Sequence, residues 1–248
     1  MNGLKNLRYF LFLLFSVYSF ASEINIALSA NMSFAIKPLI DAFQKTHDTK
    51  ITYTIGSSGK LTAQITKGAP YDLFLSANLT YPKALYHDKK ALTPPVVYAK
   101  GSLALFSTKQ RDFTKGLKLL QEPSIKKIAI ANPKTAPYGV ATVEALKHAN
   151  LYKDIKQKLI YGESISQTVA YSKTATDIGI IATSALFSDK LKNFKKGKNW
   201  IELDKNLYTP ISQAMVLLKD KKEAKEFFDF LQTKEAKEIL KRYGYIVE

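Results

Sequence analysis

Four short polar turns, each between a predicted strand and a predicted helix, contain the residues best suited to bind a small ligand. The turns are residues 29–33, 56–61, 135–139 and 163–166. Each can direct backbone N–H groups, short neutral side chains and the positive end of a helix dipole toward one point. None is built around a lysine or arginine fork. The pattern therefore predicts a site that holds an anion with uncharged hydrogen-bond donors.

The second turn, GSSGKL at residues 56–61, superficially resembles a phosphate-binding P-loop. That motif requires a glycine where Thr54 stands and a serine or threonine where Leu61 stands, so it fails at both ends. Taken alone, the turn would be an ordinary serine N-cap. Its recurrence in four turns, two in each half of the chain, favours a ligand site at the carboxyl ends of parallel strands.

Residues that could support catalysis are scattered. The histidines, His47, His87 and His148, each lie in a polar stretch, and none has metal-ligand spacing, so we expect them at the surface. The patterns His-Glu-x-x-His and Gly-x-Ser-x-Gly do not occur, and the sequence has no cysteine. A disulfide framework and a cysteine-linked lipid anchor are therefore excluded. We predict a protein without catalytic residues.

Two sets of alternating strands and helices are predicted to position the turns. The strands are 24–28, 51–55, 72–76, 128–130, 159–161 and 178–181, and the helices are 34–47, 60–67, 82–89, 138–150, 165–173 and 222–243. This alternation predicts an α/β protein with mainly parallel sheets. Extended apolar stretches at 96–107 and 208–218 interrupt the pattern. We predict lobe 1 from residues 22–98 and 207–248 and lobe 2 from residues 99–206, joined by two crossing hinge segments. A single doubly wound sheet is the alternative.

The N-terminus has the pattern of a signal peptide. Lys5 and Arg8 form a basic start, residues 9–17 are almost entirely apolar, and Ser19 and Ala21 place small residues at alternate positions. We predict that residues 1–21 are a signal peptide cleaved after about Ala21, which locates the mature protein in the periplasm. A signal anchor is the alternative.

The formal net charge of +16 raises the question of a nucleic-acid partner. Only three arginines are present, Arg8, Arg111 and Arg242, and the lysines are spread along the chain and mixed with acids, as in residues 221–226. Proteins that read bases and phosphates rely on arginine. We therefore predict a solvated basic surface and no nucleic-acid partner. Such a surface can raise the encounter rate with small anions.

Motifs along the whole mature chain resemble one family. They are SAN at 29–31, GSSGK at 56–60, GAPYDLFLSA at 68–77, PYG at 137–139, DIGI at 177–180 and KRYGY at 241–245. In this order they are similar to the molybdate-binding periplasmic proteins of ABC importers. The resemblance implies a two-lobed periplasmic binding protein fold of type II that closes on a tetrahedral dianion. It also implies a membrane permease as partner, no cofactor apart from the ligand, and a monomer.

Carried over by position, the resemblance assigns the contacts to molybdate. Ser58 would donate its hydroxyl and its N–H, and Tyr138 and Ile165 would donate backbone N–H groups from lobe 2. Asn31 occupies a position where many relatives have serine and a similar subgroup has asparagine. Ala30 beside it would add an N–H.

Three further residues affect this assignment. Many relatives carry a ligand tyrosine where this chain has Ala182, so the donor set is incomplete relative to them. Asp72, in the most diagnostic segment, is expected to fix a turn, and Glu163 is expected at the surface.

The nature of the donors predicts the ligand. A fully deprotonated dianion needs no acceptor, so molybdate or tungstate is expected, whereas hydrogen phosphate would leave its proton unpaired. Sulfate satisfies the same donors and differs in size. The alternatives are a sulfate-binding or ferric-binding protein of the same fold, although ferric capture usually requires adjacent tyrosines and a carboxylate, and then an exported enzyme or an adhesin.

Overall fold

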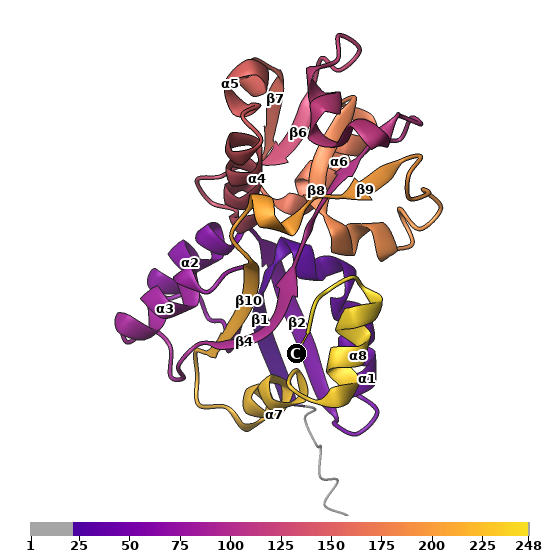
Figure 1. The fold of residues 1–248 in the computed structure, drawn as a ribbon. Coiled ribbons are helices and arrows are strands. Elements are labelled where there is room, and N and C mark those ends of the chain that lie inside the picture. Colours follow the sequence, from indigo (N-terminus) through magenta and orange to yellow (C-terminus); the bar gives the residue numbers. More distant parts are fainter. Residues whose placement is uncertain (1–21, 248) are drawn as a thin grey trace, which may run out of the picture.

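The computed structural model describes residues 22–247, and within them ten strands form two five-stranded sheets that belong to two lobes (Figure 1). The predicted signal peptide, residues 1–21, lies outside the described residues. The predicted α/β fold with two lobes is confirmed. The predicted limits between the lobes stay predictions.

Lobe 1 contains a sheet of order β2-β1-β3-β10-β4. Its elements are β1 Ser22–Ser29, β2 Thr49–Gly56, β3 Leu73–Ser76, β4 Val96–Gly101, β10 Ile211–Leu217, α1 Ile36–Phe43, α2 Ser58–Thr66, α3 Thr80–His87, α7 Lys222–Phe230 and α8 Lys234–Arg242. β1 pairs in parallel with β2 and β3, and β10 is antiparallel to both β3 and β4. The strand β10 is therefore inserted into the sheet from the far end of the chain.

Lobe 2 contains a sheet of order β7-β6-β8-β5-β9. Its main elements are β5 Leu103–Phe106, β6 Ile128–Ala131, β7 Leu159–Gly162, β8 Ile178–Ala182, β9 Trp200–Glu202, α4 Pro137–His148, α5 Tyr152–Ile155 and α6 Ile165–Thr174. β6 is parallel to β7 and β8, whereas β5 is antiparallel to β8 and β9. In each sheet four strands therefore run in one direction, and one strand, β10 in lobe 1 and β5 in lobe 2, runs in the opposite direction.

The chain crosses between the sheets twice. The first crossing is short, because β4 ends at Gly101 in one sheet and β5 begins at Leu103 in the other. The second crossing runs from the end of β9 through a 3-10 turn at Lys205–Leu207 to the start of β10. Figure 1 shows the two linking segments passing between the lobes.

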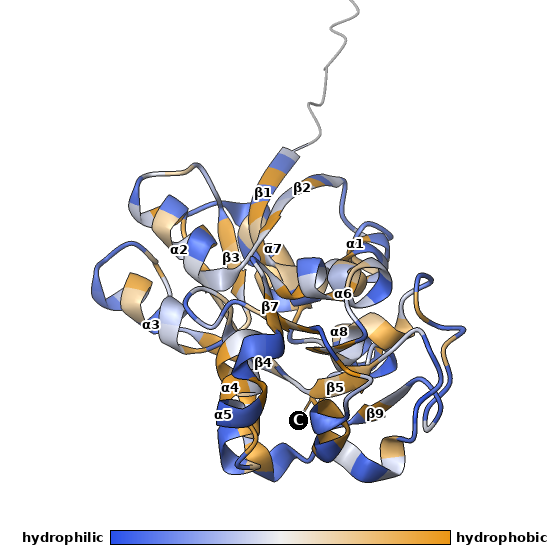
Figure 2. Ribbon diagram, turned by 90° about the horizontal axis from the view of Figure 1, so that it is seen from above, coloured by the Kyte–Doolittle hydropathy of each residue, from blue (hydrophilic) through white to orange (hydrophobic). Residues whose placement is uncertain are grey.

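Helices cover both faces of the first sheet because its central strands are apolar on both sides. Ile24, Ile26 and Leu28 of β1 pack with buried residues of α1, α7 and α8, and Ala27 packs on the opposite face with Leu61 of α2. Figure 2 shows this distribution, with hydrophobic strand segments inside and hydrophilic residues concentrated on the outer helices and loops. No helix in residues 22–247 combines the length and apolar character that a membrane crossing requires.

Two helix predictions differ from the structure. The segment predicted as one helix from 34 to 47 is a 3-10 helix at Ala30–Phe34 (η1) followed by α1, and Pro38 lies in the first turn of α1, where its missing N–H is not needed. The predicted single helix at 222–243 is wrong. It is divided into α7 and α8 because the Thr233 hydroxyl caps α8 by accepting the N–H of Ala236 at 3.3 Å.

Asp72 has a structural role at the start of β3. Its carboxylate accepts the backbone N–H of Asn25 at 2.8 Å and lies 3.6 Å and 3.8 Å from the ammonium groups of Lys219 and Lys221. The side chain therefore joins the starts of two strands to the segment that follows β10. This agrees with its expected structural function.

Candidate functional site

The four predicted turns meet at one small cavity between the lobes. The cavity is small, with about 10 Å³ of space for the centre of a water-sized sphere. Its lining residues are Ser29, Ala30, Asn31, Ser57, Ser58, Ala77, Ala136, Pro137, Tyr138 and Ile165. The structure thus brings all five residues expected to bind the ligand to one place. The sequence analysis did not assign the other five lining residues to the ligand. Four of them lie in the predicted turns, and only Ala77 lies outside them.

Contacts between the lobes surround this cavity. The N–H of Gly59 in lobe 1 donates to the carbonyl of Thr135 in lobe 2 at 2.9 Å. Lys60 and Glu163 form an ion pair with an N–O distance of 2.6 Å, and both side chains are about half exposed, so Glu163 lies at the surface as expected. The lobes are therefore in contact beside the cavity.

Backbone N–H groups at three helix starts are available to a ligand. Ser58 and Ile165 are the first residues of α2 and α6, and Tyr138 is the second residue of α4. N–H groups in the first turn have no partner within their own helix. Among residues 22–247, no acceptor elsewhere in the protein pairs with the N–H groups of Ser58, Tyr138 and Ile165. Three helix dipoles also direct their positive ends toward the cavity, which favours an anion.

The hydroxyl of Ser58 is held in an orientation that suits a donor. Its oxygen accepts the backbone N–H of Ala77 at 2.9 Å, and the side chain is buried. Because this contact uses the oxygen as an acceptor, the hydroxyl proton stays available for a ligand oxygen. Ser29 and Ser57 add two buried hydroxyls that have no hydrogen-bond partner among the described residues. Buried polar groups are normally paired, so these hydroxyls are available to bond to a ligand.

Asn31 lies at the cavity, but its side-chain amide is directed toward other protein groups. Nδ2 donates to Oε1 of Gln213 and to the hydroxyl of Tyr245, both at 2.8 Å. Oδ1 is buried and has no partner within the described chain. Asn31 lies inside η1 and does not cap a helix, because Ser29 occupies the N-cap position. Sequence reasoning missed Gln213. Tyr245 stood in the KRYGY motif, but no role was assigned to it.

The phenol of Tyr138 lies away from the helix start that bears its N–H. A Cβ added at Gly101, the last residue of β4, would meet the Tyr138 hydroxyl at 2.1 Å, so the phenol lies against the first crossing. Burial, with smaller contributions from Tyr245, Tyr98 and Tyr208, raises the pKa of Tyr138 well above its usual value. Burial also raises the pKa of Tyr245 to about 12. Both side chains are therefore neutral at physiological pH.

The cavity lining contains no charged side chain. Ala30, Ala77, Ala136, Tyr138 and Ile165 belong to one buried apolar cluster that continues into the core of lobe 2. In such an environment a hydrogen bond to a charged ligand is stronger than in water. Neutral donors in an apolar wall can stabilise an anion without a basic side chain. Ala182, at the end of β8, is buried but does not line the cavity.

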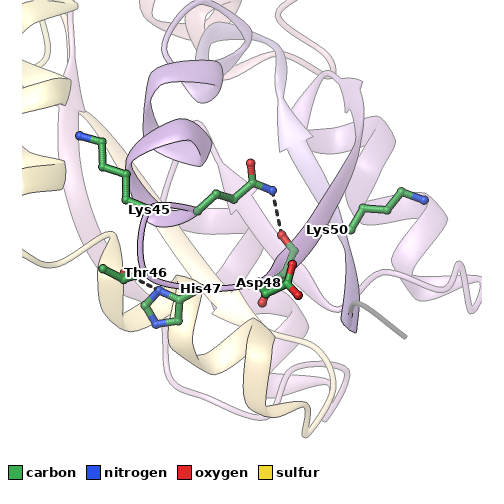
Figure 3. A pocket seen from close by; sticks show the side chains of 7 residues that line it. Lys45, Thr46, His47, Asp48 and Lys50 are labelled. Atoms are coloured by element: carbon green, nitrogen blue, oxygen red, sulfur yellow. Dashed lines mark hydrogen bonds between the residues drawn. The ribbon is translucent and has the colours of Figure 1, made fainter. Parts of the chain in front are cut away.

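The histidines lie elsewhere. His87 and His148 are exposed, and His47 is half-buried, stacked on Phe43 with ring centroids 4.0 Å apart. His47 belongs to a surface hollow lined by residues 44–50, the turn between α1 and β2 (Figure 3). Because one continuous segment of lobe 1 forms this hollow, closure of the lobes would not enclose a ligand there. Residues 22–247 contain no cluster of three or more His, Asp or Glu side chains that could hold a metal ion.

Comparisons with known proteins agree with this geometry. The family model described as bacterial extracellular solute-binding protein matches residues 24–246. The molybdate-binding protein ModA of Rhodobacter capsulatus is 36% identical over 234 residues, which cover 92% of this chain and 90% of that protein. The solved periplasmic molybdate-binding protein of Azotobacter vinelandii superposes with a TM-score of 0.84 at 28% identity and covers 91% of this chain and 99% of that one. The sulfate-binding protein SubI of Mycobacterium tuberculosis has a TM-score of 0.69 at 13% identity, covering 90% of this chain and 86% of that one, and shows a shared fold alone.

Proposed function

Because the chain belongs to the bacterial extracellular solute-binding protein family, we propose that it captures molybdate or tungstate and delivers it to the membrane permease of an ABC importer. Both relatives named as molybdate-binding proteins match it over about nine tenths of its length. The observation that carries the proposal is the cavity between the lobes, which joins free helix-start N–H groups and buried hydroxyls without a charged lining residue.

Ser58, Tyr138, Ile165, Asn31 and Ala30 are the proposed ligand residues. Ser58 donates through its hydroxyl and N–H, and the other four donate through backbone N–H groups. A dianion with four equivalent oxygens can accept all these bonds, each contributing roughly 1.5–3 kcal/mol net because the acceptor is charged. The basic surface increases the rate of encounter with the anion. Release follows when a hinge motion at the two crossings opens the lobes on the permease.

A ligand panel tests this proposal. Thermal unfolding is followed with molybdate, tungstate, sulfate, phosphate and Fe(III), each at a fixed excess. A ligand at a concentration one hundred times its Kd stabilises the native state by about 2.7 kcal/mol. Molybdate and tungstate should raise the melting temperature and phosphate should not. A shift with sulfate alone would replace the proposed ligand by sulfate, and a shift with none of the oxyanions would refute the proposed function.

The location and assembly of the protein are also proposals. We propose an exported protein cleaved after about Ala21, monomeric in the periplasm, without catalytic activity and without a nucleic-acid partner. N-terminal sequencing of the mature protein and its elution volume in size-exclusion chromatography test the first two statements. A mature N-terminus at Met1 would contradict the cleavage.

A further inference from the structure

We propose that Gln213 and Tyr245 are positioning residues that hold Asn31 and thereby set the affinity of the cavity for its oxyanion. This inference rests on the proposed function. Neither side chain lines the cavity, and both act through Asn31. The argument depends on how each of them is itself fixed.

Gln213 is a fully buried residue of the crossing strand β10. Its Nε2 donates to the carbonyl of Ile211 at 2.9 Å, which directs Oε1 toward Asn31. The pairing of β10 with β4 shifts register between Gln213 and Ala214. Such bulges change the direction of a side chain relative to a regular strand. The amide of Gln213 is therefore held in the orientation in which its Oε1 accepts a hydrogen bond from Nδ2 of Asn31.

Tyr245 reaches Asn31 from the segment after α8. The N–H and carbonyl of Ile246 pair with the carbonyl and N–H of Lys100 in β4, at 2.9 Å and 2.7 Å. Gly244 has a φ of +73°, a conformation that favours glycine, and this turn brings Tyr245 inward. The Tyr245 hydroxyl accepts from Nδ2 of Asn31 and donates to the carbonyl of Asn31 at 3.0 Å.

Together the two anchors fix both the side chain and the backbone of Asn31. Each amide hydrogen has an acceptor, and the carbonyl accepts from Tyr245. The carbonyl also accepts the Ser184 hydroxyl of lobe 2 at 3.3 Å. Gln213 lies on β10, and Tyr245 precedes Ile246, which pairs with β4, so both anchors are attached to the strands that adjoin the crossings. Because Asn31 is ordered before the ligand arrives, binding does not have to order it.

A simpler explanation is that Gln213 and Tyr245 only satisfy buried polar groups in the core. The two explanations differ in a double-mutant cycle, because a contact made to the Asn31 side chain has no effect on affinity once that side chain is removed. The variants are Gln213→Met, Tyr245→Phe, Asn31→Ala and the two doubles with Asn31→Ala. Molybdate is the probe, and its Kd is measured by calorimetry on the full mature chain.

We expect each of Gln213→Met and Tyr245→Phe to weaken molybdate binding about fivefold, the factor that corresponds to ordering one side chain. In the Asn31→Ala background, Gln213→Met should not weaken it further. Tyr245→Phe should lose only part of its effect there, because its hydroxyl still donates to the carbonyl of residue 31. Fold losses that simply multiply would overturn the inference, and so would single variants that bind as tightly as the wild type. If Gln213→Met does not fold, a smaller loss for Tyr245→Phe in the Asn31→Ala background than in the wild type decides the question by itself.

A matched pair in lobe 1 controls for general destabilisation. Tyr71 donates its hydroxyl to Oε1 of Gln64 at 3.0 Å, and this pair does not line the cavity. Tyr71→Phe and Gln64→Met should lower the melting temperature without changing the Kd. Wild-type protein that binds no oxyanion would refute the proposed function and this inference together, whereas tight wild-type binding with multiplying losses would refute this inference alone.

Discussion

Removal of the Ser58 hydroxyl is the most direct perturbation of the cavity. In Ser58→Ala the ligand loses one charge-assisted hydrogen bond, and such a bond contributes roughly 1.5–3 kcal/mol. This loss corresponds to a Kd for molybdate that is about 10- to 150-fold higher. The backbone N–H of Ala77 also loses its acceptor at 2.9 Å, so the protein itself should be destabilised by about 1–3 kcal/mol.

Two measurements separate these effects. Calorimetry with molybdate gives the Kd, and urea unfolding without ligand gives the free energy of unfolding. Ser107→Ala is the matched control. Ser107 is also buried, and its hydroxyl accepts the backbone N–H of Lys109 at 3.2 Å, but it does not line the cavity. We expect the control to lose stability and keep its affinity.

The result that would refute the reasoning is a Ser58→Ala protein with unchanged Kd. That outcome would mean that the hydroxyl proton is not used by the ligand. The double variant Ser58→Ala with Asn31→Ala should show no measurable molybdate binding while it stays folded. Unchanged affinity in the double variant would remove both residues from the site.

Three other predictions concern pH and closure. Burial raises the pKa of Tyr245 from 10.0 to about 12, so the folded state holds this proton more tightly than the unfolded chain does. The stability that results is complete below pH 10 and is lost as the pH rises through about 12. Tyr245→Phe should therefore reduce the alkaline loss of unfolding free energy by up to about 3 kcal/mol in urea titrations, and an unchanged slope would contradict this. A Cβ at Gly59 would lie 2.9 Å from the carbonyl of Thr135, so Gly59→Ala should keep the lobes apart. The molybdate Kd should rise about tenfold, and X-ray scattering of the liganded protein should give a larger radius of gyration. An unchanged Kd and radius would show that the contact is not needed. Glu163→Gln removes a half-exposed ion pair with Lys60. In stopped-flow experiments the rate of ligand dissociation should increase less than about fivefold, and the difference should disappear at high salt. A larger effect would mean that the ion pair controls the opening of the lobes.

Local signals were sufficient to predict most of the fold and the four turns that meet at the cavity. Strand alternation and the turns at residues 56–61 and 135–139 indicated where helices begin, and helix starts are where free N–H groups occur by geometry. The turns that contain Ser58 and Tyr138 could therefore be found without knowing the tertiary structure, and the family resemblance singled out the two residues within them. The break at Thr233 was missed because apolar periodicity continues across it, and a single capping hydroxyl decides the boundary.

The support of Asn31 could not be predicted in the same way. Gln213 and Tyr245 are 182 and 214 positions away from Asn31 along the chain, and only the pairing of the sheet brings them together. A bulge in β10 determines the direction of Gln213, and no residue pattern near position 213 signals it. Tyr245 belonged to a motif, but a motif does not say which atom its hydroxyl contacts.

The position of β10 in the middle of the first sheet has a consequence for the order of folding during synthesis. All strands of the second sheet come from one continuous stretch, residues 103–202, whereas the first sheet requires a strand that begins at residue 211. A growing chain can therefore complete lobe 2 while β3 and β4 still have no strand between them, and long-range pairing of this kind is slow. A fragment ending at residue 206 should show protease resistance only in lobe 2, and equal resistance in both lobes would contradict this order. Lobe 1 is therefore the part of the protein that stays incomplete for longest during synthesis.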